Sequence, residues 1–384
     1  MNPLNRKHLN EIQYARVLAL FGVFAVHSSS TGAVSTNTDS FPFIIYNFFN
    51  IAGKIGTPVF IFLSSFILFY TYYHRELTVQ LLQKFYKKRL LFILVPYIVF
   101  SAFYFFLKAY LNKNFTDIPL MLEEFMWDLA TGKAHTHLYF VFVSVQFYLM
   151  FPLLLYLFKK FAFIRRYAIP LGFVIQWSWV LLNSAYLQVP SKASVALTYF
   201  MFYFFGAFLG LYYEKVAAWI GNWRKVWPGI ALIVAGYLYM IYFYVGIYYD
   251  IRTNQWTGNS KWIEFGWSMH AFLAAAVIFI FVHFLETWNL PRVKKLMFEI
   301  GAVSFGMYLI HPFFLMILRA YLPSGEPLIF HSWQLITFLI TFLSSWLIVR
   351  LFYEFVPHSW IFFGQGNRVW NKPRKAKETK EAKV

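Results

Sequence analysis

Cysteine is absent from this chain of 384 residues, and only 13% of the residues are charged. Without cysteine there is no disulfide framework, no thiolate metal site and no cysteine nucleophile. A water-soluble domain normally has about 25% charged residues, so roughly half of the charge that a soluble surface needs is missing. These absences exclude a soluble or disulfide-stabilised protein.

Apolar and aromatic residues take the place of the missing charge. Hydrophobic residues make up 60% of the chain, which contains 48 Phe, 27 Tyr and 14 Trp. Phenylalanine suits a lipid-facing surface, whereas Tyr and Trp gather at the two membrane interfaces. The net charge of +18 does not indicate a nucleic-acid partner, because Lys and Arg fall between the apolar runs.

The apolar residues form runs of about 20 residues, the length that a helix needs to cross ~30 Å of hydrocarbon. Short segments separate the runs, which indicates one helical bundle. We therefore predict an all-α polytopic membrane protein of about ten transmembrane helices over residues 1–363, followed by a basic, disordered cytoplasmic tail over 364–384. The ten runs cover residues 14–33, 43–69, 90–111, 138–158, 163–185, 194–213, 228–248, 267–286, 301–321 and 333–355.

The distribution of Lys and Arg predicts the orientation of the bundle. The N-terminus, the C-terminal tail and every second connecting segment hold 24 of these residues, and the remaining segments hold 5. Cytoplasmic segments carry the excess of positive charge, so we expect both termini in the cytoplasm. An even number of spans, such as ten, satisfies this expectation.

Two ionisable residues occur in the first run, where a charge is costly and therefore informative. Arg16 and His27 are 11 residues apart, about three helical turns, so both side chains share one face and lie ~16 Å apart along the axis. The polar residues 28–32 follow His27, so this half of the helix is expected to border a cavity. His27 is a candidate general base and Arg16 a candidate supporting cation, unless Arg16 only reaches the lipid headgroups.

A general base usually needs a partner that orients it, and the acidic residues lie outside the deep parts of the runs. His270 and His311 are the candidates that could approach His27, although each could also be an ordinary buried histidine of the bundle. Pro312 leaves the carbonyl oxygen of Tyr308 without its helical donor, which is tolerated beside a cavity or a polar partner.

For the other basic residues near the apolar runs, the sequence allows two interpretations each. Lys54, between two glycines in the second run, either faces a water-filled vestibule or contacts an anion. Lys87, Lys88 and Arg89 precede the third run, where they either set the topology of the chain or bind the phosphates of a nucleotide-like donor.

Six segments, in order along nearly the whole chain, resemble the acyltransferase-3 family of bacterial integral membrane O-acyltransferases. The resemblance implies that His27 is essential and that Arg16 supports it, and it adds His137 and Gln146 as candidate cavity residues beside Lys54, His270 and His311. The segments are the pair Arg16 and His27, then residues 56–64 (GTPVFIFLS), 89–97 (RLLFILVPY), 137–152 (with His137 and Gln146), 205–210 (FGAFLG) and 304–312 (SFGMYLIHP).

The resemblance also implies an activity. A member of this family would move an acyl group, acetyl or succinyl, to a hydroxyl group of an envelope or extracellular glycan at the bacterial cell membrane. The expected partners are acyl-CoA as co-substrate, the glycan and the lipid bilayer, without nucleic acid, metal or bound cofactor.

Two departures from the family pattern leave a second function open. Phe92 and Ser144 stand where many members carry Arg and Glu. At these two positions the chain resembles one branch of the family, whose members are viewed either as poly-N-acetylglucosamine exporters or as O-succinyltransferases. The alternative function is therefore export of such a polysaccharide. Whether His27 acts as a base or as a nucleophile also stays open.

Overall fold

The computed structural model describes residues 9–113, 117–323 and 325–366, and these residues form helices and connecting segments without a strand. Within them, nine helices are long and apolar enough to cross a membrane, and Ala196–Leu211 with Tyr213–Gly221, which meet at 80°, make a tenth if they count as one bent span. The prediction of an all-α membrane protein with about ten spans is confirmed. Residues 367–384, most of the predicted tail, lie outside the described residues.

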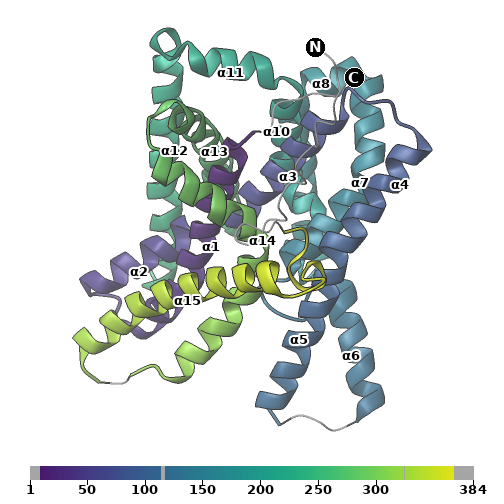
Figure 1. Cartoon of the computed structure of the whole chain (residues 1–384). Helices are drawn as coiled ribbons and strands as arrows, with labels where there is room; N and C mark the ends of the chain where they lie inside the picture. Colours follow the sequence, from purple (N-terminus) through teal and green to yellow (C-terminus); the bar gives the residue numbers. More distant parts are fainter. Residues whose placement is uncertain (1–8, 114–116, 324, 367–384) are drawn as a thin grey trace, which may run out of the picture.

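The helices are arranged as an irregular bundle (Figure 1). A π-helical segment, Leu90–Leu94, joins α4 to α5, and a 3₁₀ turn, Ala196–Tyr199, leads into α10. The α-helices are α1 (Glu11–Ser35), α2 (Phe41–Ala52), α3 (Gly56–Tyr72), α4 (Val79–Arg89), α5 (Val95–Leu111), α6 (Ile118–Thr131), α7 (Tyr139–Lys160), α8 (Ala162–Arg166), α9 (Ala168–Leu182), α10 (Phe200–Leu211), α11 (Tyr213–Gly221), α12 (Trp223–Arg252), α13 (Ser260–Thr287), α14 (Pro291–Ala320), α15 (Pro327–Phe355) and α16 (Trp360–Phe363).

Helix α1 is unbroken and contains both Arg16 and His27. It packs against α2, α3, α13, α14 and α15. The two polar side chains can therefore face neighbouring helices instead of lipid, where a charge would be costly.

The second apolar run is not one helix, because it breaks between α2 and α3 at residues 53–55. A Cβ atom on Gly22 of α1 would lie 2.9 Å from the carbonyl oxygen of Gly53, and one on Gly53 would lie 2.6 Å from that of Gly22. The two backbones thus touch, which glycine allows because it has no side chain. The linker that carries Lys54 is held against α1.

A second close backbone contact fixes α10 on α3. Gly206 and Gly210 are four residues apart on α10. A Cβ atom at these positions would lie 2.2 Å from the carbonyl oxygen of Phe62 and 2.6 Å from that of Phe66. This spacing of small residues is typical of tightly packed membrane helices.

The segment 112–137, expected as a loop, contains α6. This helix of 14 residues is ~21 Å long and therefore too short to cross the bilayer. It runs back alongside α5, and the two project from the bundle as a hairpin (Figure 1).

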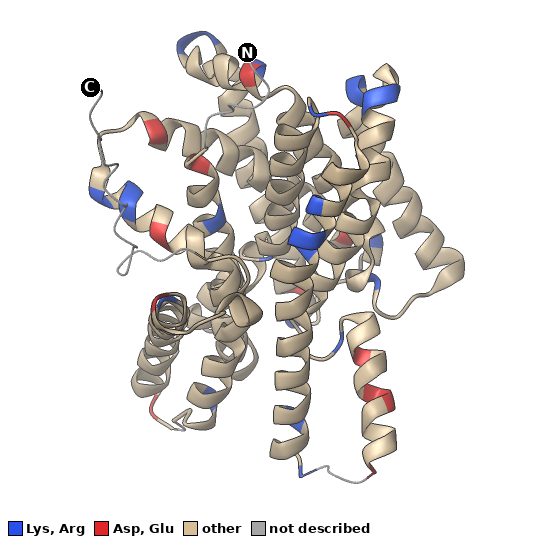
Figure 2. Cartoon of the chain, turned by 45° about the vertical axis from the view of Figure 1, so that its right-hand side comes forward, with Lys and Arg blue, Asp and Glu red and all other residues tan. Residues whose placement is uncertain are grey.

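Positive charge is unevenly distributed over the bundle. Figure 2 shows more Lys and Arg residues in the upper half of the bundle, the half that carries α8 and α11 in Figure 1, than in the lower half. We expect the upper half to face the cytoplasm, since cytoplasmic segments are rich in Lys and Arg.

This orientation predicts that reporter tags fused to Met1 and Val384 both lie in the cytoplasm. The measurement is protease accessibility of each tag in intact cells and in opened cells. Both tags should resist an external protease until the membrane is opened. Cleavage of only one tag in intact cells would contradict an even number of spans.

Candidate functional site

One cavity of the bundle lies beside Arg16 and another beside His27. The first, which we call the Arg16 cavity, has a volume of about 450 Å³. Arg16 donates a hydrogen bond from Nη1 to Oε1 of Gln13, 3.2 Å away, and both border the cavity. Lys88 and Arg89 border it from the end of α4, so three cations meet there.

Aromatic and hydroxyl side chains complete the Arg16 cavity. The guanidinium of Arg89 lies 4.7 Å from the ring centroid of Tyr148, a separation that suits a cation–π contact. The hydroxyl groups of Tyr148 and Ser64 are 3.2 Å apart. This cavity combines positive charge with hydroxyl groups, which suits a phosphate-bearing ligand.

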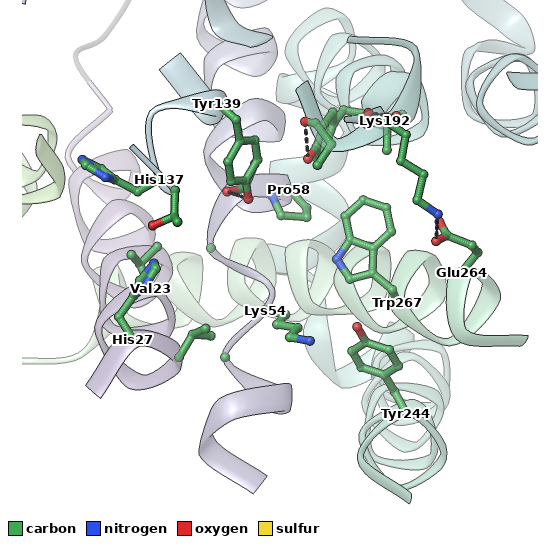
Figure 3. A pocket seen from close by; sticks show the side chains of 18 of the residues that line it. Val23, His27, Lys54, Pro58, His137, Tyr139, Lys192, Tyr244, Glu264 and Trp267 are labelled. Atoms are coloured by element: carbon green, nitrogen blue, oxygen red, sulfur yellow. Dashed lines mark hydrogen bonds and ion pairs between the residues drawn. The ribbon is translucent and has the colours of Figure 1, made fainter. Parts of the chain in front are cut away.

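The second cavity, which we call the His27 cavity, has a volume of about 330 Å³. Figure 3 shows His27 and His137 on one side of it, with Trp267 and Tyr244 on the other. Lys54 extends into it from the linker between α2 and α3.

Tyr308 of α14 borders both cavities. Its ring packs edge-on against Phe140, with centroids 5.0 Å apart, and against Phe60 at 6.4 Å. Its hydroxyl donates a hydrogen bond to the backbone carbonyl oxygen of His137. This ring therefore stands between the two cavities.

Four histidine rings form a chain that begins at His27. The ring centroids of His27 and His311 are 5.1 Å apart, and those of His311 and His137 are 5.5 Å apart. Nδ1 of His137 lies 2.9 Å from Nδ1 of His135. Residues from α1, α14 and the loop before α7 thus meet beside the His27 cavity.

The hydrogen bonds of His311 fix its tautomer. A carbonyl oxygen can only accept, so Nδ1 of His311 carries the proton that bonds the oxygen of Tyr308 at 2.7 Å. This is the carbonyl that Pro312 deprives of its helical donor. Nε2 of a neutral His311 is then an acceptor, and it is buried with no hydrogen-bond partner. An acceptor is therefore available within the histidine chain, next to His27.

The tautomers of His137 and His135 follow in the same way. Burial lowers the pKa of His135 to about 4 and holds the pKa of His137 well below its usual value, so both rings are neutral near pH 7. Nε2 of His137 donates to the oxygen of Leu309 at 3.2 Å. Its Nδ1 must then accept from Nδ1 of His135.

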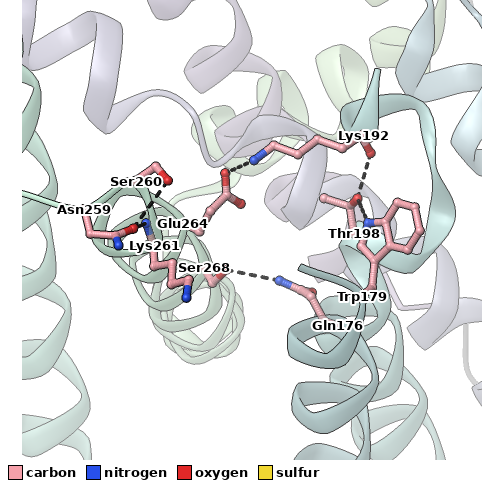
Figure 4. A network of polar contacts seen from close by, with 9 residues as sticks. All are labelled: Gln176, Trp179, Lys192, Thr198, Asn259, Ser260, Lys261, Glu264 and Ser268. Atoms are coloured by element: carbon pink, nitrogen blue, oxygen red, sulfur yellow. Dashed lines mark hydrogen bonds and ion pairs between the residues drawn. The ribbon is translucent and has the colours of Figure 1, made fainter. Parts of the chain in front are cut away.

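An ion pair closes the far side of the His27 cavity. Lys192, the first residue of a separate 3₁₀ turn (Lys192–Ser194), pairs with Glu264 of α13. Figure 4 shows how this turn is held: the hydroxyl of Thr198 donates to the backbone oxygen of Lys192 at 2.7 Å and accepts from Nε1 of Trp179 at 3.0 Å. The positive charge of Lys192 is neutralised within the cavity wall.

The structure brings most of the predicted residues to one or other cavity. Arg16, Lys88 and Arg89 share the Arg16 cavity, whereas Lys87 is exposed and borders a separate groove on α4. Successive residues of a helix point ~100° apart, which explains the separation of Lys87 from Lys88.

The remaining predicted residues divide between the His27 cavity and the surrounding bundle. Lys54 and His137 border the cavity, and His311 packs on His27. Gln146 borders neither cavity, because its side chain bonds the backbone of Ser194 and Ala196. His270 is fully buried, stacks on Tyr237 and does not border either cavity.

Sequence reasoning missed His135, Lys192, Glu264 and Arg319. Arg319 donates to the hydroxyl of Ser30 at 2.7 Å and to the backbone oxygen of His27, so it ties α14 to α1. The spacing His135, Thr136, His137 was a signal for two neighbouring rings. Lys192 and Glu264 are 72 residues apart, and no local pattern indicates that they meet.

Comparison with known proteins identifies a family and several relatives. A model described as an acyltransferase domain (Acyl_transf_3) matches residues 9–350. The "Probable poly-beta-1,6-N-acetyl-D-glucosamine export protein" of Staphylococcus aureus (strain MRSA252) is 26% identical over 311 residues, which are 78% of this chain and 81% of that protein. The "Putative membrane-bound acyltransferase YfiQ" of Bacillus subtilis (strain 168) is 24% identical over 304 residues, 77% and 75% of the two chains. No solved structure matches the chain.

Proposed function

This chain belongs to the acyltransferase-3 family of membrane proteins, and from that premise we propose that it transfers an acyl group from cytoplasmic acyl-CoA to a hydroxyl group of an envelope or extracellular glycan. The observation that carries the proposal is the pair of cavities that meet at Tyr308. One cavity has cations for a phosphate-bearing donor, and the other has a histidine for a hydroxyl acceptor.

The donor binds in the Arg16 cavity. Lys88 and Arg89, at the end of α4, are placed to contact the phosphates of the coenzyme. Arg16 lies deeper on α1, on the way to His27, where its guanidinium can direct two hydrogen bonds at the donor. The acyl end reaches the His27 cavity when the ring of Tyr308 turns aside.

The acceptor hydroxyl binds beside His27. One ring nitrogen of His27 takes the hydroxyl proton while the oxygen attacks the acyl carbonyl carbon, forming the ester bond and breaking the thioester C–S bond. The proton then passes to the departing thiolate of coenzyme A. His311 can accept a hydrogen bond at Nε2 from the other nitrogen of His27, which holds the base in the required tautomer.

Export of poly-N-acetylglucosamine is the second candidate, favoured by the printed names of the staphylococcal relatives. An exporter needs a continuous lumen, whereas here Tyr308 and its aromatic neighbours Phe60 and Phe140 separate two cavities of about 450 and 330 Å³. The geometry therefore suits transfer between two compartments better than passage of a polymer.

Mass spectrometry of envelope glycans from cells with and without the protein separates the two functions. Transfer predicts an added acyl mass on the glycan only when the protein is present, with unchanged polymer yield. Loss of external polymer without any change in acyl mass would instead support export and contradict our proposal.

The position of Lys87 supplies a control for donor binding. We expect the double substitution Lys88→Gln, Arg89→Gln to raise the apparent KM for acyl-CoA about tenfold and to change kcat less than about twofold, because contacts to remote phosphates act mainly as uniform binding. Lys87→Gln removes a charge from the same helix outside the cavity and should leave KM unchanged. Initial rates in membranes of correctly oriented protein measure both.

Equal KM values for the double variant and the Lys87→Gln control would contradict the donor site. The cluster would then serve only to orient the chain.

A further inference from the structure

The linker between α2 and α3 delivers a cation to the His27 cavity. The backbone contact between Gly22 and Gly53 holds this linker against α1, and Lys54 follows directly. Figure 3 shows the side chain of Lys54 pointing toward Tyr244 and away from His27. A molecule that reaches from Lys54 to His27 would therefore span the cavity.

Lys54 is not neutralised by a carboxylate. The ion pairs among the described residues include the neighbouring cation Lys192, paired with Glu264, but not Lys54. Instead, Nζ of Lys54 lies 3.9 Å from the ring centroid of Tyr248. An aromatic face attracts a cation without cancelling its charge, so the cavity keeps a positive charge at this point.

Arg252 adds a second positive charge at the same ring. Its guanidinium lies 5.9 Å from the ring centroid of Tyr248. It donates to the amide oxygens of Asn47 and Asn50 of α2, at 2.8 and 2.6 Å. Amides orient a guanidinium but leave its charge in place, and the described ion pairs do not include Arg252.

We propose that Lys54, with Arg252 at the other contact of Tyr248, forms an anion subsite, and that the glycan acylated in the His27 cavity carries a carboxylate or phosphate group that binds there. The proposal rests on the function proposed above and adds the chemical class of the acceptor. Lys54 borders the cavity, and Arg252, which does not border it, adds a second positive charge at the same ring. Positive charge at this point favours an anion over a neutral sugar. Trp267 and Tyr244 provide apolar faces for the ring of the same sugar.

The test compares charged and neutral sugars as ligands of the full-length protein in nanodiscs of phosphatidylcholine. The probes are D-glucuronate, D-glucose 6-phosphate and D-glucose, and ligand-observed NMR gives Kd without any acyl donor. For the wild-type protein, we expect the Kd of one or both anionic sugars to be about tenfold lower than the Kd of glucose, or lower still. A preference for glucuronate would identify the anionic group of the acceptor as a carboxylate. A preference for glucose 6-phosphate would identify it as a phosphate.

Substitutions assign the preference to Lys54. Lys54→Met should abolish the preference, and Lys54→Arg should retain it because the charge stays. Lys133→Met is the matched control: it removes one positive charge from an exposed position outside the cavity and should leave Kd unchanged.

Equal Kd values for all three sugars in the wild type, or a preference that survives Lys54→Met, would overturn the anion subsite. Neither outcome bears on acyl transfer, which the glycan mass measurement tests separately. Conversely, an anion preference that depends on Lys54 would stand even if no acylated glycan were found.

Discussion

Replacing His27 with alanine is expected to lower acyl transfer by about 10²- to 10⁴-fold, the usual cost of losing a general base. The ring lies at the His27 cavity and packs on His311, its nearest candidate partner. The substitution removes the proton acceptor but leaves α1 intact, because alanine is a strong helix former. The measurement is acyl content per sugar in the envelope glycan, with the amount of protein in the membrane determined in parallel.

His331→Ala is the matched control for this variant. His331 also makes a polar contact, 2.9 Å from Nδ1 to the hydroxyl of Tyr46, but it borders neither cavity. Loss of an imidazole there should leave acylation close to the wild-type level. Near-normal acylation by His27→Ala would remove His27 from the chemistry.

Arg16→Lys is expected to reduce acylation by about 10²-fold, because losing the contacts that orient the donor misplaces its acyl group relative to His27. Lysine keeps the charge but loses the planar fork that directs two hydrogen bonds. If Arg16 only reached the headgroups, lysine would serve equally well. Acyl content per sugar and total external polymer should be measured together, and only the first should fall.

Arg165→Lys tests whether loss of any guanidinium fork produces the same effect. Nη1 of Arg165 donates to the backbone oxygens of Phe158 and Lys159, both at 2.8 Å, at the end of α7. It lies outside both cavities, so acylation should persist. Full acylation in Arg16→Lys would exclude a directed role for Arg16, and a loss of polymer alone would favour export.

The sequence was informative where a single helix decides the geometry. Arg16 and His27 share a face because one unbroken helix carries both, and the helical period alone places them. Likewise, Pro312 indicated that the carbonyl oxygen of Tyr308 needs another donor, which His311 supplies.

Contacts between elements could not be predicted in this way. His270 and His311 looked equivalent in the sequence, yet only His311 packs on His27, because the rotation of each helix depends on its neighbours. The break between α2 and α3 at residues 53–55 could not be predicted either, because it also involves a contact between two helices. The apolar run continues through it, and the contact between Gly22 and Gly53 that accompanies the break joins residues far apart in the sequence.

The ring of Tyr308 has a consequence for the cell beyond catalysis. An enzyme that receives its donor on one side of a membrane and its acceptor on the other would leak ions if its two chambers joined as an open channel. The ring of Tyr308, held by a hydrogen bond to the loop before α7, stands between the two chambers. For the function proposed here, we expect a smaller residue at position 308 to leave only Phe60 and Phe140 between the chambers and therefore to raise the leakage of protons across the membrane.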